Sequence, residues 1–379
     1  MRIKELYAVN FRNYANCQLA LPAMINVFYG ANAQGKTNLL EAIFYGAFGM
    51  SHRTNQEEDL LKLGNDAMAV GVVYESFSGN HEVKLKKYKQ QERWKKEILL
   101  DGAKVRPKEH YGALNAVMFS PEDLQLVKGE PALRRRFFDM QISQTDPVYY
   151  DLLVKYNRVL LQRNRLLKDL RDNGGNVAVL QPWNEEFIRL AAAITAKRMG
   201  ALGNLEAIAT EVYASITEHK EQLTVGYELK ANNGELLYPG TAAEIGEAFY
   251  RSHLAERQRI DILRGNTGIG PHRDDLRLLL NGVSLRSFGS QGQQRSGALA
   301  LKLSQLEYVH RQIGEYPVLL LDDVMSELDN NRRAQLLRFI DGRVQTFITV
   351  NDRELIPPLA GNAYYFIANG KISEVEDGQ

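Results

Sequence analysis

The sequence predicts an α/β fold in which a mostly helical insert interrupts a head built on a parallel sheet. Three observations lead to this class. An apolar run at residues 25–29 meets a glycine-rich turn and then a helical pattern. A second apolar run, at residues 318–321, ends in two acids. Between these runs, helical periodicity begins near Asp146. Continuous apolar runs are typical of buried parallel strands, which bind ligands at their carboxyl ends.

Composition sets broad limits on the protein. Its 379 residues allow two or more lobes with large cores. The formal net charge is only +1, so any nucleic-acid surface must come from local patches. The single cysteine, Cys17, excludes an intramolecular disulfide and a cysteine zinc cluster. The early charges exclude a secretory signal, and no apolar run approaches about 18 residues, so we expect a cytoplasmic protein without a membrane span.

The glycine-rich turn reads GxxxxGKT between a strand and a helix, which is the context of a phosphate-binding loop. Its glycines permit backbone angles that a Cβ forbids, and the helix N-terminus adds a positive end. We expect Lys36 to reach the β- and γ-phosphates of ATP and to take part in catalysis. We expect Thr37 to ligate Mg²⁺. The predicted phosphate-binding residues are Gly30, Ala31, Asn32, Ala33, Gln34, Gly35, Lys36 and Thr37.

The rest of the N-terminal part is predicted to be mainly β structure. Strands are expected at residues 3–9 and 17–21, and the helix after the loop is expected to end near Gly49. Arg53 follows this helix and is either a phosphate contact or a surface arginine. Residues 117–119 predict a further buried strand.

A basic hairpin is expected within residues 67–101, with its turn at residues 78–80. It carries seven positive charges and one negative charge over residues 84–96, with Tyr88 and Trp94 interleaved. Such a hairpin either tracks a nucleic-acid backbone or is a solvated hairpin whose lysines discourage edge pairing. The basic residues are Lys84, Lys86, Lys87, Lys89, Arg93, Lys95 and Lys96.

The insert is predicted to contain an antiparallel helical hairpin. Apolar residues recur every three or four positions from Leu152 to Leu170, residues 172–176 stop this pattern, and a second arm runs to about Glu218. Another helix is expected from Ala242 to about Leu263. Basic residues along the first arm either face phosphates or form a solvated face; they are Arg158, Arg163, Arg165, Lys168 and Arg171. We therefore predict head segments at residues 1–130 and 265–379 and a helical insert lobe at residues 131–264.

Two further motifs complete the predicted ATP site. Ser290-x-Gly292 opens a helix of about 20 residues and is a second anion-binding feature. It follows a hairpin with Asn281-Gly282 as its type I′ turn. After the strand at residues 318–321, Asp322 is expected to hold Mg²⁺ through its water shell, and catalytic Asp323 to orient or activate the attacking water. The metal-sensing glutamine is either Gln125 or Gln141.

These motifs, in this order and around a helical insert, resemble the architecture of ATP-binding-cassette (ABC) heads. In that class the SxG helix completes the site of a second subunit, so that ATP joins two heads and hydrolysis releases them. The alternatives are the motor subunit of a membrane transporter, which the basic insert fits poorly, and a small-molecule kinase, which leaves SxG and the acidic pair unexplained. The leading hypothesis is an ATP-gated DNA clamp, and DNA retention in a salt titration separates it from both alternatives.

At these motifs the chain resembles the RecF family of the SMC-like group, over essentially its whole length. The motifs are NFRNY at residues 10–14, GANAQGKTN at 30–38, SPEDLQLVKG at 120–129, RRRFFD at 134–139, GPHRDDL at 270–276, SQGQQR at 290–295 and LLLDDVMSELD at 319–329. The resemblance implies that five further residues bind the nucleotide beside the phosphate loop: Arg12, Asn38, Ser290, Gly292 and Gln293. It implies a weak DNA-dependent ATPase, ATP-dependent homodimers, and DNA binding on duplex and gap junctions. It also implies cooperation with RecR and RecO in loading RecA, and roles in repair, replication and SOS induction.

Two departures from the general cassette pattern predict slow turnover. The second acid is Asp323 rather than a glutamate, so its carboxylate is one methylene shorter. Residues 349–352 occupy the switch region after the last core strand and include no histidine. We therefore expect the ATP state to be long-lived, with turnover not far above about 10 s⁻¹, the typical enzyme median.

Overall fold

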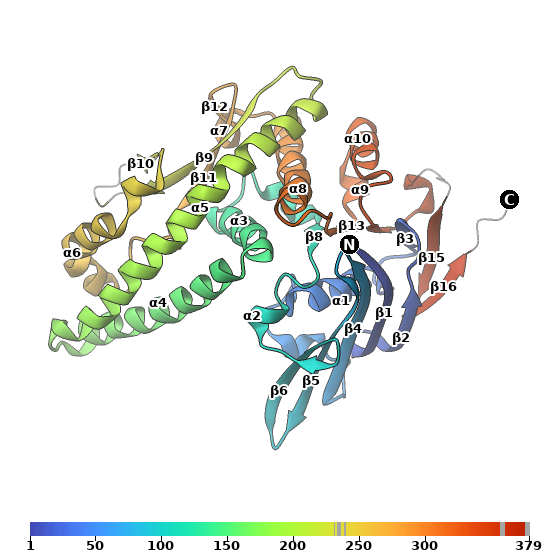
Figure 1. The fold of residues 1–379 in the computed structure, drawn as a ribbon, viewed down its shortest axis with the longest axis horizontal. Coiled ribbons are helices and arrows are strands. Elements are labelled where there is room, and N and C mark those ends of the chain that lie inside the picture. Colours follow the sequence, from blue (N-terminus) through green and yellow to red (C-terminus); the bar gives the residue numbers. More distant parts are fainter. Residues whose placement is uncertain (231, 233–235, 239, 357–360, 376–379) are drawn as a thin grey trace. The chain divides into compact units, whose positions relative to one another are not determined.

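The computed structural model describes residues 1–230, 232, 236–238, 240–356 and 361–375. Its contacts divide the chain into two compact units (Figure 1). Unit 1 comprises Met1–Leu124 and Gln305–Gln379, and unit 2 comprises Gln125–Ser304. Residues 265–304, which the sequence assigns to the head, group with the insert because β11 (Asp275–Leu280) pairs along its length with β9 (Leu223–Lys230). The functional division into head and insert stays a prediction.

Among the described residues, unit 1 contains a six-stranded sheet that is parallel except at one edge. Every residue is buried in two neighbouring strands of this sheet, β13 (Val318–Asp322) and β14 (Thr346–Val350). Such burial is expected of apolar runs that are covered on both faces of a sheet. In spatial order its strands are β16 (Lys371–Val375), β15 (Asn362–Ala368), β3 (Ile25–Tyr29), β14 (Thr346–Val350), β13 (Val318–Asp322) and β8 (Ala116–Phe119).

A second sheet of unit 1 is antiparallel and begins at the N-terminus (Figure 1). Strand β5 alternates buried and partly buried residues through its centre, so one face meets the core and the other faces solvent. In spatial order the described strands are β2 (Tyr14–Ala20), β1 (Arg2–Phe11), β4 (Ala67–Ser76), β5 (Gly79–Gln90), β6 (Arg93–Leu100) and β7 (Ala103–Lys104).

Helix α1 (Lys36–Phe48) joins these two sheets, because it contacts β4 and β5 of one and β13 and β14 of the other. Nearly all of its residues are buried, and a helix that is apolar on all sides suits such a position. A Cβ on Gly46 would lie 2.6 Å from Val72 Cγ2 of β4, so this contact requires glycine.

Buried Gln345 also links the two sheets. Its amide nitrogen donates to the carbonyls of Ile3 (2.8 Å) and Leu21 (3.1 Å), and its oxygen accepts from the Ile3 amide (2.6 Å). The short helices of unit 1 and of the chain segment that leads into unit 2 are η1 (Glu57–Leu60), α2 (Pro107–His110), η2 (Pro121–Gln125), α9 (Val324–Glu327), α10 (Asn330–Ile340) and η5 (Arg353–Leu355).

Unit 2 contains the predicted helical hairpin, formed by α4 (Pro147–Asn173) and α5 (Gln181–Ile216). Asp146 caps α4 by accepting from the amides of Val148 and Tyr149. The other helices are α3 (Pro131–Thr145), η3 (Val177–Leu180), η4 (Ala242–Ile245), α6 (Glu247–Arg264), α7 (Leu285–Phe288) and α8 (Gln291–Ile313), the last of which continues into unit 1.

The insert also carries strands that the sequence analysis did not predict. Strand β9 pairs with β11, and the described sheet has the order β10-β9-β11-β12, with β10 at Leu236–Leu237 and β12 at Val283–Ser284. Residues of β9 alternate between buried and partly buried, and this two-residue period was available in the sequence. The turn after β11 has positive φ at Asn281 (49°) and Gly282 (81°), as predicted for type I′.

Buried ion pairs hold the helices of unit 2. Arg163 of α4 is fully buried and pairs with Asp261 of α6 at 3.2 Å, so it does not belong to a solvated or phosphate-facing surface. Arg198 of α5 pairs with Asp139 of α3 at 2.8 Å. Breaking a buried pair of this kind costs about 3–5 kcal/mol, because the remaining charge is left without a partner.

Candidate nucleotide-binding site

The phosphate loop lies between β3 and α1 in unit 1. Gly30 (φ 143°) and Gly35 (φ 116°) both adopt conformations that favour glycine. Space is a second constraint, because a Cβ on Gly30 would lie 2.4 Å from the Ile367 carbonyl oxygen. A Cβ on Gly35 would lie 2.5 Å from the Asn13 amide nitrogen. The two glycines of GxxxxGKT are therefore required by both backbone angle and close approach.

Two turns from distant parts of the chain form hydrogen bonds with the loop at Gln34. The Gln34 carbonyl accepts from Asn13 Nδ2 (3.1 Å) and from the Gly370 amide (3.2 Å). The Gln34 side-chain oxygen accepts from the Asn369 amide at 2.6 Å. Asn369 (φ 50°) and Gly370 (φ 70°) form the turn between β15 and β16. This hairpin was not predicted from the sequence, although Asn-Gly between two apolar runs is a recognisable signal.

Lys36 is buried at the start of α1, where all three ammonium hydrogens find acceptors. It donates to the carbonyls of Gly30 (2.6 Å) and Ala31 (2.9 Å) and to Asn351 Oδ1 (2.9 Å). Burial lowers the pKa of Lys36, and the nearby Asp323 and Asp322 carboxylates oppose that shift. Asn351 was not predicted as a site residue.

Thr37 and Asp322 meet as the sequence predicts. Thr37 Oγ1 donates to Asp322 Oδ1 at 2.8 Å, and Thr349 Oγ1 donates to the same oxygen at 2.8 Å. Within the described residues no cluster of three or more metal-binding side chains occurs. Mg²⁺ is usually held by one or two carboxylates together with substrate phosphates and water. The hydroxyl of Thr37 and the carboxylate of Asp322 therefore fit a magnesium site that is completed by ATP.

Asp323 stands next to this pair in a left-handed conformation (φ 52°). Its amide donates to Thr349 Oγ1 at 2.9 Å, so Thr349 fixes both acids after β13. Burial raises the pKa of Asp323, the charge of Lys36 opposes this, and Asp322 adds to it. A carboxylate with a raised pKa accepts a proton more readily, which suits the predicted role of Asp323.

Arg12 lies near the loop but engages a buried carboxylate. Its guanidinium donates twice to Glu41 of α1, at 2.7 Å each, and Glu41 also accepts from Ser51 Oγ at 2.6 Å. Burial alone would raise the pKa of Glu41, but the hydrogen bonds from Arg12 and Ser51 outweigh it and hold this pKa below its usual range. A contact of Arg12 with nucleotide stays a prediction.

Asn38 connects Arg53 to the β1–β2 turn. Asn38 donates to Asn13 Oδ1 (2.9 Å), and Arg53 Nη1 donates to Asn38 Oδ1 (3.0 Å) and lies 3.5 Å from Glu41. The Arg53 side chain is 47% exposed, so it borders the loop without being buried there. Its role toward phosphate stays a prediction.

The SxG motif heads α8 in unit 2. Ser290 Oγ accepts from the Gln293 amide at 3.2 Å, and Gln293 Oε1 accepts from the Ser290 amide at 2.8 Å. This reciprocal cap leaves Ser290 exposed at the helix N-terminus, next to Gly292. The assignment of Ser290, Gly292 and Gln293 to a nucleotide stays a prediction.

Gln125 and Gln141 differ in accessibility. Gln125 is exposed at the end of η2, whereas Gln141 of α3 is fully buried and neither amide atom has a hydrogen-bond partner among the described residues. The choice of Gln125 or Gln141 as the metal-sensing glutamine stays a prediction. Arg273 donates to the carbonyl of Thr267, so its guanidinium supports the loop before β11.

Acids partly neutralise the basic hairpin. Lys87 pairs with Glu58 at 2.7 Å, and Lys96 pairs with Glu57 at 2.6 Å. Lys89 pairs with Glu92 at 2.5 Å, a charge already included in the count over residues 84–96. Glu57 and Glu58 lie outside that range, so the count overstates the positive field of this surface.

Comparison with known proteins gives matches along the whole chain. A family model described as RecF/RecN/SMC N terminal domain matches residues 2–365. The chain is 41% identical over 353 residues to the DNA replication and repair protein RecF of Halothermothrix orenii, covering 93% of this chain and 92% of that protein. It is 38% identical over 380 residues to the protein of the same name from Macrococcus caseolyticus, covering 100% and 99%.

Solved structures show the same architecture. A structure of the recombination mediator protein RecF-ATPrS in the RecFOR pathway matches with a TM-score of 0.88 and 33% identity, covering 99% of this chain and 98% of that chain. An Smc head bound to the C-terminal winged-helix domain of ScpA matches with a TM-score of 0.56 and 13% identity, covering 100% and 98%, and so shares the fold alone. These matches confirm the predicted fold class, an α/β head of the ABC type with a helical insertion. Among the described residues, no helix is both long and apolar enough to cross a membrane.

The ion pair of Glu41 predicts a defined pH dependence of stability. Because its folded pKa is lowered, the pair stabilises the fold above the unfolded pKa of about 4.3, and this contribution disappears as pH falls through the folded value. Glu41→Gln is expected to lower the free energy of unfolding by about 2 kcal/mol at pH 7. Urea unfolding at pH 7, 5 and 3.5 measures the difference, which should shrink at the lowest pH. Glu5→Gln, at an exposed position of β1, is the control; a gap that does not change with pH contradicts the assignment.

Proposed function

Because the chain belongs to the RecF/RecN/SMC N-terminal domain family, we propose that it is an ATP-dependent DNA-binding protein of recombinational DNA repair. ATP joins two copies head to head on DNA, and slow hydrolysis releases them. In this role the protein works with RecR and RecO to load RecA at gaps, which serves recovery of replication and induction of the SOS response. The names of the relatives and of the solved ATP complexes support the repair role.

The observation that carries the proposal is the gathering of four predicted side chains at one loop. Thr37 and Asp322 are in hydrogen-bond contact, and the charges of Asp322 and Asp323 act on Lys36. Ser290, at the exposed N-terminus of α8, supplies the complementary half of the site in the partner copy. A helix N-terminus stabilises anions, so Ser290 suits the γ-phosphate of ATP.

The chemistry is the transfer of the γ-phosphoryl group of ATP to water. Lys36 stabilises negative charge on the β- and γ-phosphates. Thr37 and Asp322 would hold Mg²⁺, which when bound would supply positive charge that offsets the negative charge of the phosphates. Water oxygen bonds to the γ-phosphorus, the bond to the ADP oxygen breaks, and Asp323 accepts the proton of the water.

Slow turnover follows from the switch region. The three ammonium hydrogens of Lys36 already have acceptors, so a phosphate oxygen must replace one of them. Asn351 is the acceptor that can rotate away, because the other two are carbonyls of the loop itself. Each nucleotide cycle therefore includes a rearrangement at Asn351, and Asp323 is shorter than the glutamate common in cassettes.

We place the DNA contact on α4 rather than on the basic hairpin. Arg158, Arg165 and Lys168 are exposed, and their spacing puts them on one helix face over about 15 Å. No ion pair joins these three side chains to an acid in the described part of the chain. Three hairpin lysines, by contrast, are paired with acids: Lys87, Lys89 and Lys96 pair with Glu58, Glu92 and Glu57.

Ser290→Arg is expected to abolish ATP-dependent dimerisation while ATP binding by the monomer stays unchanged, because the arginine blocks the partner's γ-phosphate. Light scattering with and without Mg²⁺-ATP measures the mass, and a fluorescent ATP analogue measures binding. Ser252→Arg places the same side chain on an exposed serine of α6 as a control. If the Ser290 variant forms dimers at the ATP concentrations at which the wild-type chain does, the cross-subunit assignment is wrong.

Asp323→Asn is expected to reduce ATP hydrolysis about 100-fold or more, since a general base contributes about 10²–10⁴-fold. ATP binding should persist, so the variant should accumulate as a dimer. Single-turnover hydrolysis gives the rate, and Asp341→Asn, at an exposed site after α10, is the control. Wild-type turnover in the Asp323 variant would remove this residue from catalysis.

Replacing Arg158, Arg165 and Lys168 together with alanine is expected to weaken duplex DNA binding and its salt dependence. The slope of log K against log salt should fall by about 0.9 for each DNA phosphate that the variant no longer neutralises. A fluorescence anisotropy titration at several salt concentrations measures both quantities. The comparison variant replaces exposed Arg93 and Lys95 of the hairpin. A larger slope change in the hairpin variant than in the α4 variant would move the DNA contact to the hairpin.

A further inference from the structure

The cap of the SxG helix depends on the orientation of one side-chain amide. Gln293 Oε1 accepts from the Ser290 amide at 2.8 Å. The other end of the same group, Nε2, donates to Glu221 Oε1 at 2.6 Å. The amide of Gln293 therefore connects Ser290 to a carboxylate that lies far away in the sequence.

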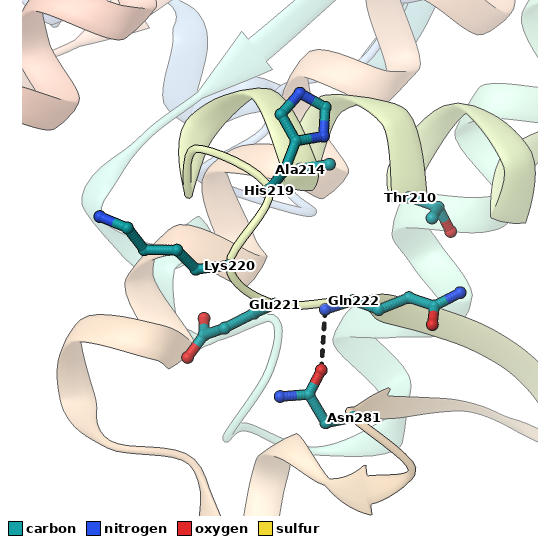
Figure 2. A pocket seen from close by; sticks show the side chains of 7 residues that line it. All are labelled: Thr210, Ala214, His219, Lys220, Glu221, Gln222 and Asn281. Carbon is teal, nitrogen blue, oxygen red and sulfur yellow. Dashed lines mark hydrogen bonds between the residues drawn. The ribbon is translucent and has the colours of Figure 1, made fainter.

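Glu221 sits in the segment between α5 and β9, and both of its carboxylate oxygens are engaged. Tyr213, fully buried on α5, donates to Glu221 Oε2 at 2.8 Å. The next residue, Gln222, exchanges backbone and side-chain hydrogen bonds with Asn281 at 2.9 Å each. Figure 2 shows Glu221 and Asn281 at the wall of a pocket of about 280 Å³. Tyr213 therefore holds the carboxylate itself, while the β11–β12 turn holds the backbone of the next residue.

A carboxylate sets the direction of an amide because it only accepts hydrogen bonds. Facing Glu221, Gln293 must present its NH₂ group, which leaves its oxygen for the Ser290 amide. With Glu221 removed, the Gln293 amide can turn over, and its NH₂ would then face the N–H of Ser290. Two donors that face each other cannot form the cap, and the first turn of α8 then has no defined position.

We propose that Glu221 is a positioning residue for the nucleotide-sandwiching function of Ser290. It acts through Gln293, and it touches neither ATP nor the reacting atoms. Through Tyr213 and the β11–β12 turn it ties the start of α8 to the helical hairpin of the insert. The inference rests on the proposed function, in which Ser290 binds the γ-phosphate held by the partner copy.

Two substitutions at Glu221 test the proposal. Glu221→Ala removes the acceptor and is expected to raise the dissociation constant of the ATP-bound dimer about tenfold or more. Glu221→Gln keeps a carbonyl acceptor but adds an NH₂ group that can face Gln293 instead, so its dissociation constant should lie between those of wild type and Glu221→Ala. Glu218→Ala, in the same segment but paired with Lys220, is the matched control and should match wild type.

The readouts separate positioning from general damage to the fold. Fluorescent ATP-analogue binding to the monomer should be unchanged in every Glu221 variant, because the phosphate loop is intact. The turnover of Glu221→Ala should recover as protein concentration is raised, since the defect is in dimerisation. A wild-type dimer constant in Glu221→Ala overturns the inference, as does a defect of equal size in the control Glu218→Ala.

Failure of the proposed function has a different signature. In that case the wild-type chain stays monomeric with Mg²⁺-ATP, or Ser290→Arg dimerises as well as wild type. If the wild-type chain dimerises, Ser290→Arg does not, and Glu221→Ala equals wild type, only the role of Glu221 is overturned.

Discussion

The hydrogen bonds that hold the phosphate loop between two turns are the constraint on which the site depends. Gln34 is bound by Asn13 on one side and by Asn369 and Gly370 on the other. With both glycines of the loop packed against neighbouring groups, α1 starts at a fixed place beside the acids that follow β13. The turns β1–β2 and β15–β16, near the two ends of the chain, thus position the loop. The reactive side chains themselves come from α1 and from the end of β13.

Local signals in the sequence predicted the parts of this site that are built from neighbouring residues. The phosphate loop, the acids after β13 and the Asn281-Gly282 turn all combine an apolar run with a residue type that only one backbone geometry explains. The clamp at Gln34 and the pair of Arg12 with Glu41 were missed because they join distant segments. The Asn369-Gly370 turn carries the same signal as Asn281-Gly282 and was open to prediction; which loop it contacts was not.

The number of positive residues in a segment does not show how many of them have ion-pair partners. The basic hairpin has the highest density of positive residues, yet Lys87 and Lys96 pair with acids of η1. On α4, the sequence treats Arg163 as equal to its neighbours, whereas its burial against Asp261 makes it part of the core. Sequence spacing shows which charges share a helix face, but only packing shows which of them already have a partner.

In the proposed dimer, each ATP site draws its loop from one copy and its Ser290 from the other. Mixing two inactive variants tests it most directly: Lys36→Ala lacks a working loop, and Ser290→Arg lacks a working SxG helix. The measurement is ATP turnover of the mixture at concentrations where light scattering shows mixed dimers. Two-copy sites predict turnover well above the sum of the separate samples, because each mixed dimer contains one intact site. Turnover equal to that sum would contradict the account, since each chain would then use its own Ser290.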